Sequence, residues 1–286
     1  MLPNFETVRP AGLLSNEIAK AAEEMLRQLR RDADRGMPDA QFKLGVLYFE
    51  GKGVPQDYVE AARLWRLAAA LGDAGVQYNL GVLSSEGKGV PQDSVEAARL
   101  YRLAAAQGHA AAQSNLGNLY SGGKGVPQDY VEAARLYRLA AAQGNARAQL
   151  NLGALYSEGK GVPQDSVEAA RLWRLAAAQG NADAQFNLGF LCSNGLGVPQ
   201  DFVEAARLYR LAAAHGLADA REALALLSSE RAFVSACCMG CGTTRKLKTC
   251  AKCKVARFCG AECVRRAWAE HKPHCRRWEA QAAEEP

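Results

Sequence analysis

The sequence predicts an all-α fold: an α-solenoid of helix-pair repeats with a 36-residue period, followed by a small cysteine-rich domain. Three observations support this prediction. The chain matches itself at a shift of 36 residues without an insertion, each repeated unit holds two stretches with helical spacing of apolar residues, and eight of the nine cysteines fall between Cys237 and Cys275. A constant period of this length is typical of stacked supersecondary units.

Two short motifs define the repeat. Leu-Gly recurs at 44/45, 80/81, 116/117, 152/153 and 188/189, and Val-Pro-Gln-Asp begins at 54, 90, 126, 162 and 198. The motifs keep the same phase throughout the repeated region. They define five complete units, which we place at 37–72, 73–108, 109–144, 145–180 and 181–216.

Each unit is predicted to form two helices. In the second unit, helical spacing connects first Val76, Leu80 and Leu83, and then Val95, Ala98, Leu100 and Leu103. The Gly-Lys-Gly-Val-Pro segment at 87–91 cannot continue a helix. We expect the second helix to begin in a capping box, in which Asp93 caps backbone N–H groups and Glu96 reaches back, and to end at Gly108.

The two ends of the array require caps, because a single helix pair cannot bury its own apolar face and the pairs must stack. Residues 16–36 align with a second helix and carry a charged face, which suits an N-terminal capping helix. Residues 217–230 are expected to form a C-terminal capping half-repeat, so that the solenoid spans 37–230. The remaining segments are predicted as a flexible N-terminus (1–15), a linker (231–237) and a tail (276–286).

The repeat motif resembles the Sel1-like repeat (SLR), a relative of the tetratricopeptide repeat (TPR). The resemblance rests on Ala-x-x-x-Leu-Gly-x-x-Tyr, Gly-x-Gly-Val-x-x-Asp and Ala-x-x-Trp-x-x-x-Ala-Ala-x-x-Gly, and it covers roughly 37–230. It implies a solenoid that serves as an adaptor surface for other proteins.

The positions at which the copies differ are the candidates for partner contact. In the first helices these are Phe42, Tyr78, Ser114, Leu150 and Phe186 and, four residues on, Val46, Val82, Asn118, Ala154 and Phe190. A helical wheel places them opposite the stripe of Ala40, Leu44 and Leu47, so we expect them to face a groove or solvent. Of these, Phe42, Tyr78, Phe186 and Phe190 are our candidate contact residues, and neutral drift at exposed positions is the alternative explanation.

Other repeated residues favour structural roles. The aromatic column is expected to form inter-repeat core, and Cys192, which replaces a tyrosine, to be a buried thiol. Glu60 with Arg63, and their counterparts, should form a solvated helix face. An asparagine ladder is expected to make structural hydrogen bonds. The column consists of Trp65, Tyr101, Tyr137, Trp173 and Tyr209, and the ladder of Asn79, Asn115, Asn151 and Asn187.

The cysteine-rich segment predicts a zinc-binding domain. No apolar window is long enough for a membrane span, and no secretory signal opens the chain. We therefore expect an intracellular protein, in the cytoplasm or the nucleus. In that reducing environment, clustered thiols are expected to bind metal. Zinc takes four tetrahedral thiolate or imidazole donors, and donors two or three residues apart can bind one ion together. Chance clustering and redox cysteines are the alternatives. The donors form four pairs: Cys238 with Cys241, Cys250 with Cys253, Cys259 with Cys263, and His271 with Cys275.

This spacing, with Phe258 before the fifth donor and Trp268 before the seventh, resembles the MYND zinc finger over 238–275. The resemblance implies interleaved sites. Spacing alone also allows sequential pairing, and Cys237 and His274 are alternative donors that depart from the family spacing. The interleaved zinc 1 site would hold Cys238, Cys241, Cys259 and Cys263, and the zinc 2 site Cys250, Cys253, His271 and Cys275.

The MYND resemblance also implies binding of short proline-rich peptides, for which Trp268 is our candidate contact. One departure from the family is Val264, which stands where a glutamine usually follows the sixth donor.

The segment carries nine Lys or Arg against two Glu, a local charge of +7, which seven thiolates (−7) and two zinc ions (+4) reduce to about +4. Nucleic-acid binding is therefore only weakly favoured.

Taken together, these features predict a non-enzymatic protein–protein interaction scaffold with two structural zinc ions. A methyltransferase that carries this type of finger needs a separate catalytic domain, and the segments outside the repeats and finger are too short for one. The alternative is a nucleic-acid-associated transcriptional regulator that uses the basic finger. Neither the partner nor the oligomeric state follows from the sequence.

Overall fold

The structure is a computed structural model that describes residues 11–69, 72–236, 248–249 and 257–258. The chain divides into two compact units, Met1–Gln179 and Gly180–Pro286. The boundary falls between the fourth and fifth repeats.

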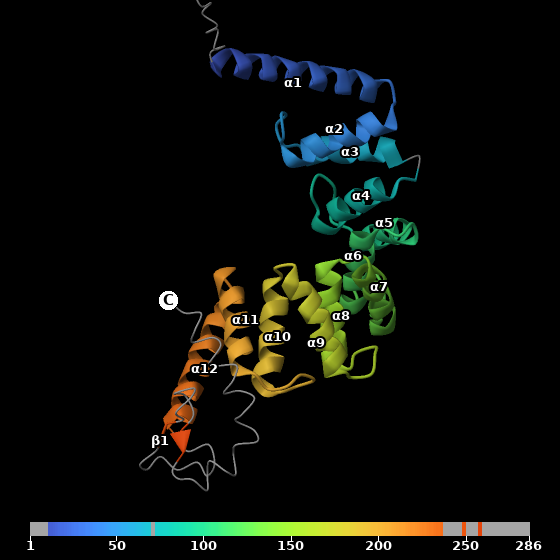
Figure 1. The fold of residues 1–286 in the computed structure, drawn as a ribbon. Coiled ribbons are helices and arrows are strands. Elements are labelled where there is room, and N and C mark those ends of the chain that lie inside the picture. The colour runs from blue at the N-terminus through green and yellow to red at the C-terminus, as the bar shows by residue number, and fades with distance from the viewer. Residues whose placement is uncertain (1–10, 70–71, 237–247, 250–256, 259–286) are drawn as a thin grey trace, which may run out of the picture. The chain divides into compact units, whose positions relative to one another are not determined.

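The first unit is a series of helix pairs that follows a single long helix, which lies at one end of the series next to α2 (Figure 1). Each helix packs against the next one along the chain. The predicted helix pairs are confirmed. The helices are α1 (Ala11–Asp34), α2 (Pro38–Glu50), α3 (Tyr58–Ala68), α4 (Ala74–Glu86), α5 (Ser94–Ala106), α6 (Ala110–Gly122), α7 (Tyr130–Ala142), α8 (Ala146–Glu158) and α9 (Ser166–Ala178).

Among its described residues, the second unit holds the fifth repeat, one further helix and a short hairpin. Its helices are α10 (Ala182–Asn194), α11 (Phe202–Ala214) and α12 (Ala218–Ala236). Two-residue strands, β1 (Lys248–Thr249) and β2 (Arg257–Phe258), pair antiparallel, with Lys248 opposite Phe258 and Thr249 opposite Arg257. Cys192 is buried in α10, as the sequence predicts.

The loop within each repeat is built by the Val-Pro-Gln-Asp motif. In the second repeat, Gly87 ends α4 in the left-handed conformation, at φ 69°. The Gln92 side chain then donates a hydrogen bond to the Ser85 carbonyl in the last turn of α4 (2.9 Å). The Asp93 carboxylate accepts from the N–H groups of Val95 and Glu96 at the start of α5. The motif thus satisfies polar groups at two helix ends.

The capping box that the sequence predicts forms only in part. Asp93 caps α5, but Glu96 does not reach back to the Asp93 N–H, because that N–H already donates to the Ser84 carbonyl (2.8 Å). The Glu96 side chain instead binds Arg99 through two hydrogen bonds of 2.7 Å. The equivalent pairing recurs in the other copies, including Glu60 with Arg63, as expected for a solvated face.

The core of each repeat is a contact between a helix glycine and an aromatic ring. Tyr137 in α7 is 2% exposed and lies directly against Gly117 of α6, where a Cβ would come within 2.6 Å of the ring. All five aromatic residues of the predicted column are buried, so the prediction that they form core is confirmed. In the tryptophan copies the indole N–H also donates to the first helix, as Trp173 does to the Leu150 carbonyl (2.9 Å).

A chain of glutamine side chains joins successive repeats in the first unit. Gln143 at the end of α7 donates to the Gln113 side chain in α6 (2.8 Å), and Gln113 in turn donates to the Ala105 carbonyl of α5 (3.3 Å). Gln113 is only 4% exposed, so these bonds satisfy a buried amide. The same bond joins Gln107 to Gln77 and Gln179 to Gln149.

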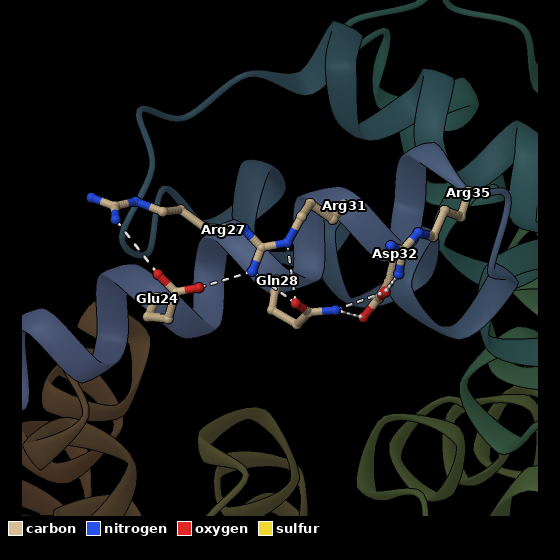
Figure 2. Close-up of polar contacts among 6 residues, drawn as sticks. All are labelled: Glu24, Arg27, Gln28, Arg31, Asp32 and Arg35. Carbon is tan, nitrogen blue, oxygen red and sulfur yellow. Dashed lines mark hydrogen bonds and ion pairs between the residues drawn. The ribbon is translucent and has the colours of Figure 1, made fainter.

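The capping helix α1 has the two faces that the sequence predicts. Leu26, Leu29 and Ala33 pack on the cluster around Leu44, and the opposite face is charged. On that face Arg31 pairs with Glu24 at 2.8 Å, and Gln28 links Arg31 to Asp32 (Figure 2).

Both end helices exceed their predicted bounds. Residues 11–15 were expected to be flexible but belong to α1, and 231–236 were expected as a linker but belong to α12. No glycine or proline occurs from Ala218 to the end of α12, so nothing in the local sequence stops that helix. The expected flexible residues 1–10 and the tail 276–286 lie outside the described residues.

A glycine substitution tests the core contact. We expect Gly117→Ala to lower the free energy of unfolding by about 1 to 3 kcal/mol, because the added methyl group clashes with the Tyr137 ring. Gly122→Ala in the same helix is the control, since its Cβ would meet nothing closer than 3.7 Å and alanine favours helix by up to about 1 kcal/mol. In thermal and urea unfolding, the free energy of unfolding should fall for Gly117→Ala and rise for Gly122→Ala. A change in the same direction for both variants would contradict the proposed contact.

Candidate functional site

The predicted zinc donors fall in the second unit, and all eight lie outside the described residues. The described part of this segment is the β1–β2 hairpin. Four of the predicted donors lie close to the two strands in the sequence, so the pairing of the strands bears on the order of these donors along the hairpin. Cys250 directly follows Thr249, and Cys259 directly follows Phe258.

The register of the hairpin fixes the order in which the chain passes these positions. Thr249 pairs with Arg257, so the connection that carries Cys250 and Cys253 joins the strands at that end. Lys248 pairs with Phe258 at the other end, where the chain arrives from Cys241 and departs towards Cys259. In the sequence, the first donor pair therefore precedes β1, the second pair lies in the connection between the strands and the third pair follows β2.

The donor set fits zinc. It consists of seven thiols and one imidazole in four pairs, which is the number that two closed tetrahedral sites require. Within the residues that the structure describes, no group of three or more His, Cys, Asp or Glu side chains could hold a metal ion.

The candidate contact residues on the first helices are less exposed than the sequence predicts. Phe42 and Tyr78 are half-buried and pack on the cores formed with the following repeat. Tyr78 stacks on His109 with ring centroids 4.7 Å apart, and Phe186 lies 5.5 Å from the Tyr209 ring. Phe190 differs, because 49% of its surface is exposed. Of these four residues, Phe190 alone presents a largely free side chain.

The helical-wheel expectation is wrong for Ser114, which is fully buried. Its hydroxyl oxygen has no hydrogen-bond partner in the structure, although sister copies place Phe, Tyr or Leu at this position. A helical wheel assumes that each helix packs against the rest of the protein on one face only. In the stack a first helix is covered both by its own repeat and by its neighbours, so the face opposite Ala40 and Leu44 is also partly buried.

The candidate contact residues are divided between the two units. Phe42 and Tyr78 belong to the first unit, and Phe186 and Phe190 to the second. Trp268 lies outside the described residues.

A polar cluster that the sequence did not single out as a site lies on the first helices of the third and fourth repeats. Asn118 accepts hydrogen bonds from the Tyr137 hydroxyl and from the Asn151 amide, both at 2.7 Å. Arg147 donates to Asn115. The prediction that the asparagine ladder makes structural hydrogen bonds is thus confirmed for Asn115 and Asn151.

Burial of this cluster changes the ionisation of its tyrosine. Desolvation raises the pKa of Tyr137 above its usual value of 10.0, and hydrogen bonds with Ser121 and Asn151 offset part of the shift. The pKa of Tyr101, one repeat earlier, is raised by the same cause, with Ser85 and Asn115 opposing it. Both hydroxyls are therefore neutral structural groups at neutral pH.

No helix within the described residues is both long enough and apolar enough to cross a bilayer.

The architecture and the donor set together define a class: a helical-repeat protein with a cysteine-rich zinc finger after its repeats. The Sel1 repeat model matches residues 38–73, 74–109, 110–145, 146–181 and 182–217, and the MYND finger model matches 238–275. The chain belongs to the Sel1 repeat family. The matched repeats begin one residue later than our units, and the finger has the bounds that we predicted.

Two solved structures of similar proteins are informative. A protective antigen of uropathogenic Escherichia coli strains with an SLR fold is 32% identical, with a TM-score of 0.67 over 88% of this chain and 50% of that one. This chain thus spans half of that protein's length. A Sel1 repeat protein from Oxalobacter formigenes is also 32% identical, with a TM-score of 0.65, over 74% of this chain and 85% of the other.

The buried tyrosines predict loss of stability in alkali. The folded state raises their pKa, so it holds these protons more tightly than the unfolded state, whose tyrosines titrate near about pH 10. Their contribution is complete below that pH and is lost as the pH rises through the folded pKa. We expect the double variant Tyr101→Phe, Tyr137→Phe to flatten the decline in unfolding free energy between about pH 9 and 11.

Urea unfolding over this pH range measures the effect, with Tyr58→Phe as a control that removes a half-buried tyrosine outside the column. An unchanged decline in the double variant would contradict the assignment.

Proposed function

We propose that this protein is a non-enzymatic scaffold whose repeats and finger each bind another protein, and that the finger is held together by two structural zinc ions. Sel1 repeats and MYND fingers both mediate protein–protein interactions. The observation that carries the proposal is the combination of five in-phase Sel1 repeats with a complete MYND finger in one chain.

The structure of the repeats supports a role in binding rather than catalysis. Where the structure describes the chain, the repeated polar side chains satisfy helix ends and one another, as Asp93, Gln92 and Glu96 do. The tyrosine hydroxyls with raised pKa values are buried structural groups. None of these arrangements sets a nucleophile beside a general base, the geometry that nucleophilic catalysis requires.

Two zinc ions with interleaved donors are the arrangement that we favour. The family pattern implies it, and the hairpin register supports it because the chain from Cys241 enters the hairpin at the end from which Cys259 leaves. Zinc 1 would then be bound by Cys238, Cys241, Cys259 and Cys263, and zinc 2 by Cys250, Cys253, His271 and Cys275. Four protein donors at each ion leave no position for an activated water, so the ions would act structurally.

The finger's partner is proposed to be a proline-rich peptide, with Trp268 as the contact residue. The MYND resemblance supports this choice, although Val264 replaces the usual glutamine. Phe190 is our candidate for partner contact on the fifth repeat, because its ring is the most exposed of the four divergent aromatic residues. We place the protein inside the cell, where a reducing environment keeps clustered thiols available for metal.

Zinc analysis of cysteine variants tests the donor assignment. With interleaved sites, Cys238→Ser, Cys259→Ser damages one site and should leave about one zinc per chain, whereas Cys238→Ser, Cys250→Ser damages both and should leave none. Elemental analysis of the purified full chain gives the count, with two zinc ions expected in the unaltered protein.

The two double cysteine variants also distinguish interleaved from sequential pairing. Sequential pairing reverses the two results, because Cys238 and Cys250 would then share one ion. EDTA should unfold the finger and leave the helical signal of the repeats, since a small metal domain derives much of its stability from the ion. The zinc proposal would be contradicted if the purified protein contained no zinc, or if EDTA did not unfold the finger.

Peptide binding is tested on the zinc-loaded full chain by calorimetry with a proline-rich peptide. We expect Trp268→Ala to weaken binding by about tenfold or more, because buried aromatic residues contribute most to such interfaces, while the zinc content stays unchanged. Val264→Gln restores the usual family residue and should strengthen binding. Phe190→Ala is the control on the repeats and should not affect this peptide. Equal binding by all four proteins would contradict the assignment to the finger.

A further inference from the structure

The third repeat departs from its sister copies along one side of its first helix, α6. Three positions four residues apart hold Ser114, Asn118 and Gly122, and such positions lie on the same side of a helix. This side of α6 carries only small or polar residues, and it lacks the glutamate that three sister helices carry. The sister residues are Phe42, Val46 and Glu50, then Tyr78, Val82 and Glu86, then Leu150, Ala154 and Glu158, and finally Phe186, Phe190 and Asn194.

Loss of this glutamate leaves a lysine without its acidic partner. In three sister copies the lysine two residues after the glutamate pairs with it, at 2.6, 2.8 and 2.9 Å. Gly122 cannot form this pair, and no carboxylate of the described residues lies within 4.0 Å of the Lys124 ammonium group. The Lys124 side chain covers Gly122 instead, with its Cγ 3.7 Å from the place of a Cβ. The C-terminal end of α6 therefore carries an uncompensated positive charge. The three sister pairs are Lys52 with Glu50, Lys88 with Glu86 and Lys160 with Glu158.

A second cation is held nearer the other end of α6. Arg147, at the start of α8, donates one hydrogen bond to the side-chain oxygen of Asn115 on α6. A neutral amide positions the guanidinium without compensating its charge, and none of the carboxylates in the described part of the chain lies within 4.0 Å of it. A guanidinium has five N–H donors, so this bond leaves most of them available to a ligand. Sister copies place Asp, Gly or Ala at this position, so the arginine is particular to this junction.

The serine on α6 and the arginine on α8 are matched in size. At the first junction the equivalent residues are neighbours, since the Phe42 ring lies 3.8 Å from the place of a Cβ on Gly75. At the third junction the small Ser114 therefore leaves room for the long side chain of Arg147 on the next helix. The Ser114 hydroxyl is fully buried and has no hydrogen-bond partner, which destabilises the fold. Packing alone thus does not explain this exchange of residues.

An amide donor lies between the two cations along α6. The side-chain oxygen of Asn118 accepts from the Tyr137 hydroxyl and from the Asn151 amide, both at 2.7 Å. These two bonds fix the half-buried Asn118 side chain, whose amide nitrogen makes no hydrogen bond to any described residue. The nitrogen is therefore a positioned donor that a carbonyl group of a ligand would satisfy.

The spacing of these groups along α6 limits the shape of the ligand. The two cations meet α6 at Asn115 and at Gly122, which are seven residues apart. Seven residues make almost two turns, so the two points lie on the same side of the helix and about 10 Å apart. A peptide in the polyproline II conformation advances about 9 Å in three residues, and its side chains at every third position point the same way. Two carboxylates three residues apart would therefore match the two cations.

We propose that α6 binds an extended acidic segment of a partner protein, in which two carboxylates three residues apart bind Arg147 and Lys124 and a backbone carbonyl between them accepts from Asn118. The inference rests on the proposed scaffold function for its class of partner. It concerns other residues than the finger and Phe190, so a negative result here would leave the tests of zinc and of the finger's peptide unaffected.

The charges favour an acidic peptide over a nucleic acid. A nucleic acid presents a phosphate at every nucleotide, whereas α6 offers two cations. The first helices of the two adjacent repeats keep a glutamate, Glu86 or Glu158, at the position of Gly122. The sequence over 1–179 holds 20 Lys or Arg and 19 Asp or Glu, a net of 20 − 19 = +1, so the unit lacks the excess of positive charge that nucleic-acid binding needs.

The test uses the zinc-loaded full chain and the peptide Gly-Ser-Glu-Thr-Val-Glu-Ser-Gly, capped at both ends so that its only carboxylates are the two glutamates. We expect saturable binding by calorimetry, weakened when the salt concentration rises from about 0.05 M to about 0.5 M. A peptide with glutamine in place of both glutamates should bind at least about tenfold more weakly, because two charge pairs are lost. A peptide with the same composition and adjacent glutamates should also bind more weakly, because it cannot reach both cations.

Two pairs of variants separate the site from total charge. Gly122→Glu restores the residue of three sister copies, supplies Lys124 with a partner and should weaken binding about fivefold or more, whereas Gly122→Gln has the same size and should leave the affinity unchanged. Arg147→Gln should also weaken binding about fivefold. Its control, Lys160→Gln, removes the same charge from a lysine that pairs with Glu158 and should have no effect.

Three results would overturn the proposal. The first is that the unaltered chain does not bind the Glu-Thr-Val-Glu peptide. The second is that Gly122→Glu and Gly122→Gln bind it equally. The third is that single-stranded oligothymidine displaces the peptide, which would identify the ligand as a nucleic acid.

Discussion

The contact between a glycine on each first helix and an aromatic ring on each second helix sets the geometry of every repeat. Gly117 brings α6 so close to Tyr137 that a single methyl group would not fit. Close approach buries the ring and lets its polar atom reach the first helix, as the Tyr137 hydroxyl does at Asn118. The remaining features of the repeat, including its loop and its junctions, depend on this distance between the two helices.

The repeat period and the core could be predicted from the sequence because both are local and repeated. Val-Pro-Gln-Asp fixes the helix ends within each repeat, Leu-Gly marks the close contact inside the first helix, and the burial of the aromatic column follows from its regular position. The C-terminal bound of α12 could not, because no glycine or proline occurs within that helix, and the start of α1 was missed although Pro10 directly precedes Ala11. The capping box also failed in part, since the backbone N–H of Asp93 was already bound to a carbonyl that lies outside the motif.

The surfaces were harder to predict because they form between repeats. A wheel for a single helix predicts one buried face, whereas Ser114 and Tyr78 are covered from a second side by the stack. The finger could be recognised from the spacing of its donors, whose individual assignment stays a prediction and whose pairing spacing left open.

The glutamine chain has a consequence for how such a protein changes over evolution. Gln113 and Gln149 donate to the Ala105 and Ala141 carbonyls of the preceding repeat, the same bond at two successive junctions, so within the first unit one junction is chemically interchangeable with the next. In-frame loss or duplication of a whole repeat would bring together two surfaces that already match. The length of the array can therefore change in one genetic step, whereas a partial repeat would leave a buried amide without its partner.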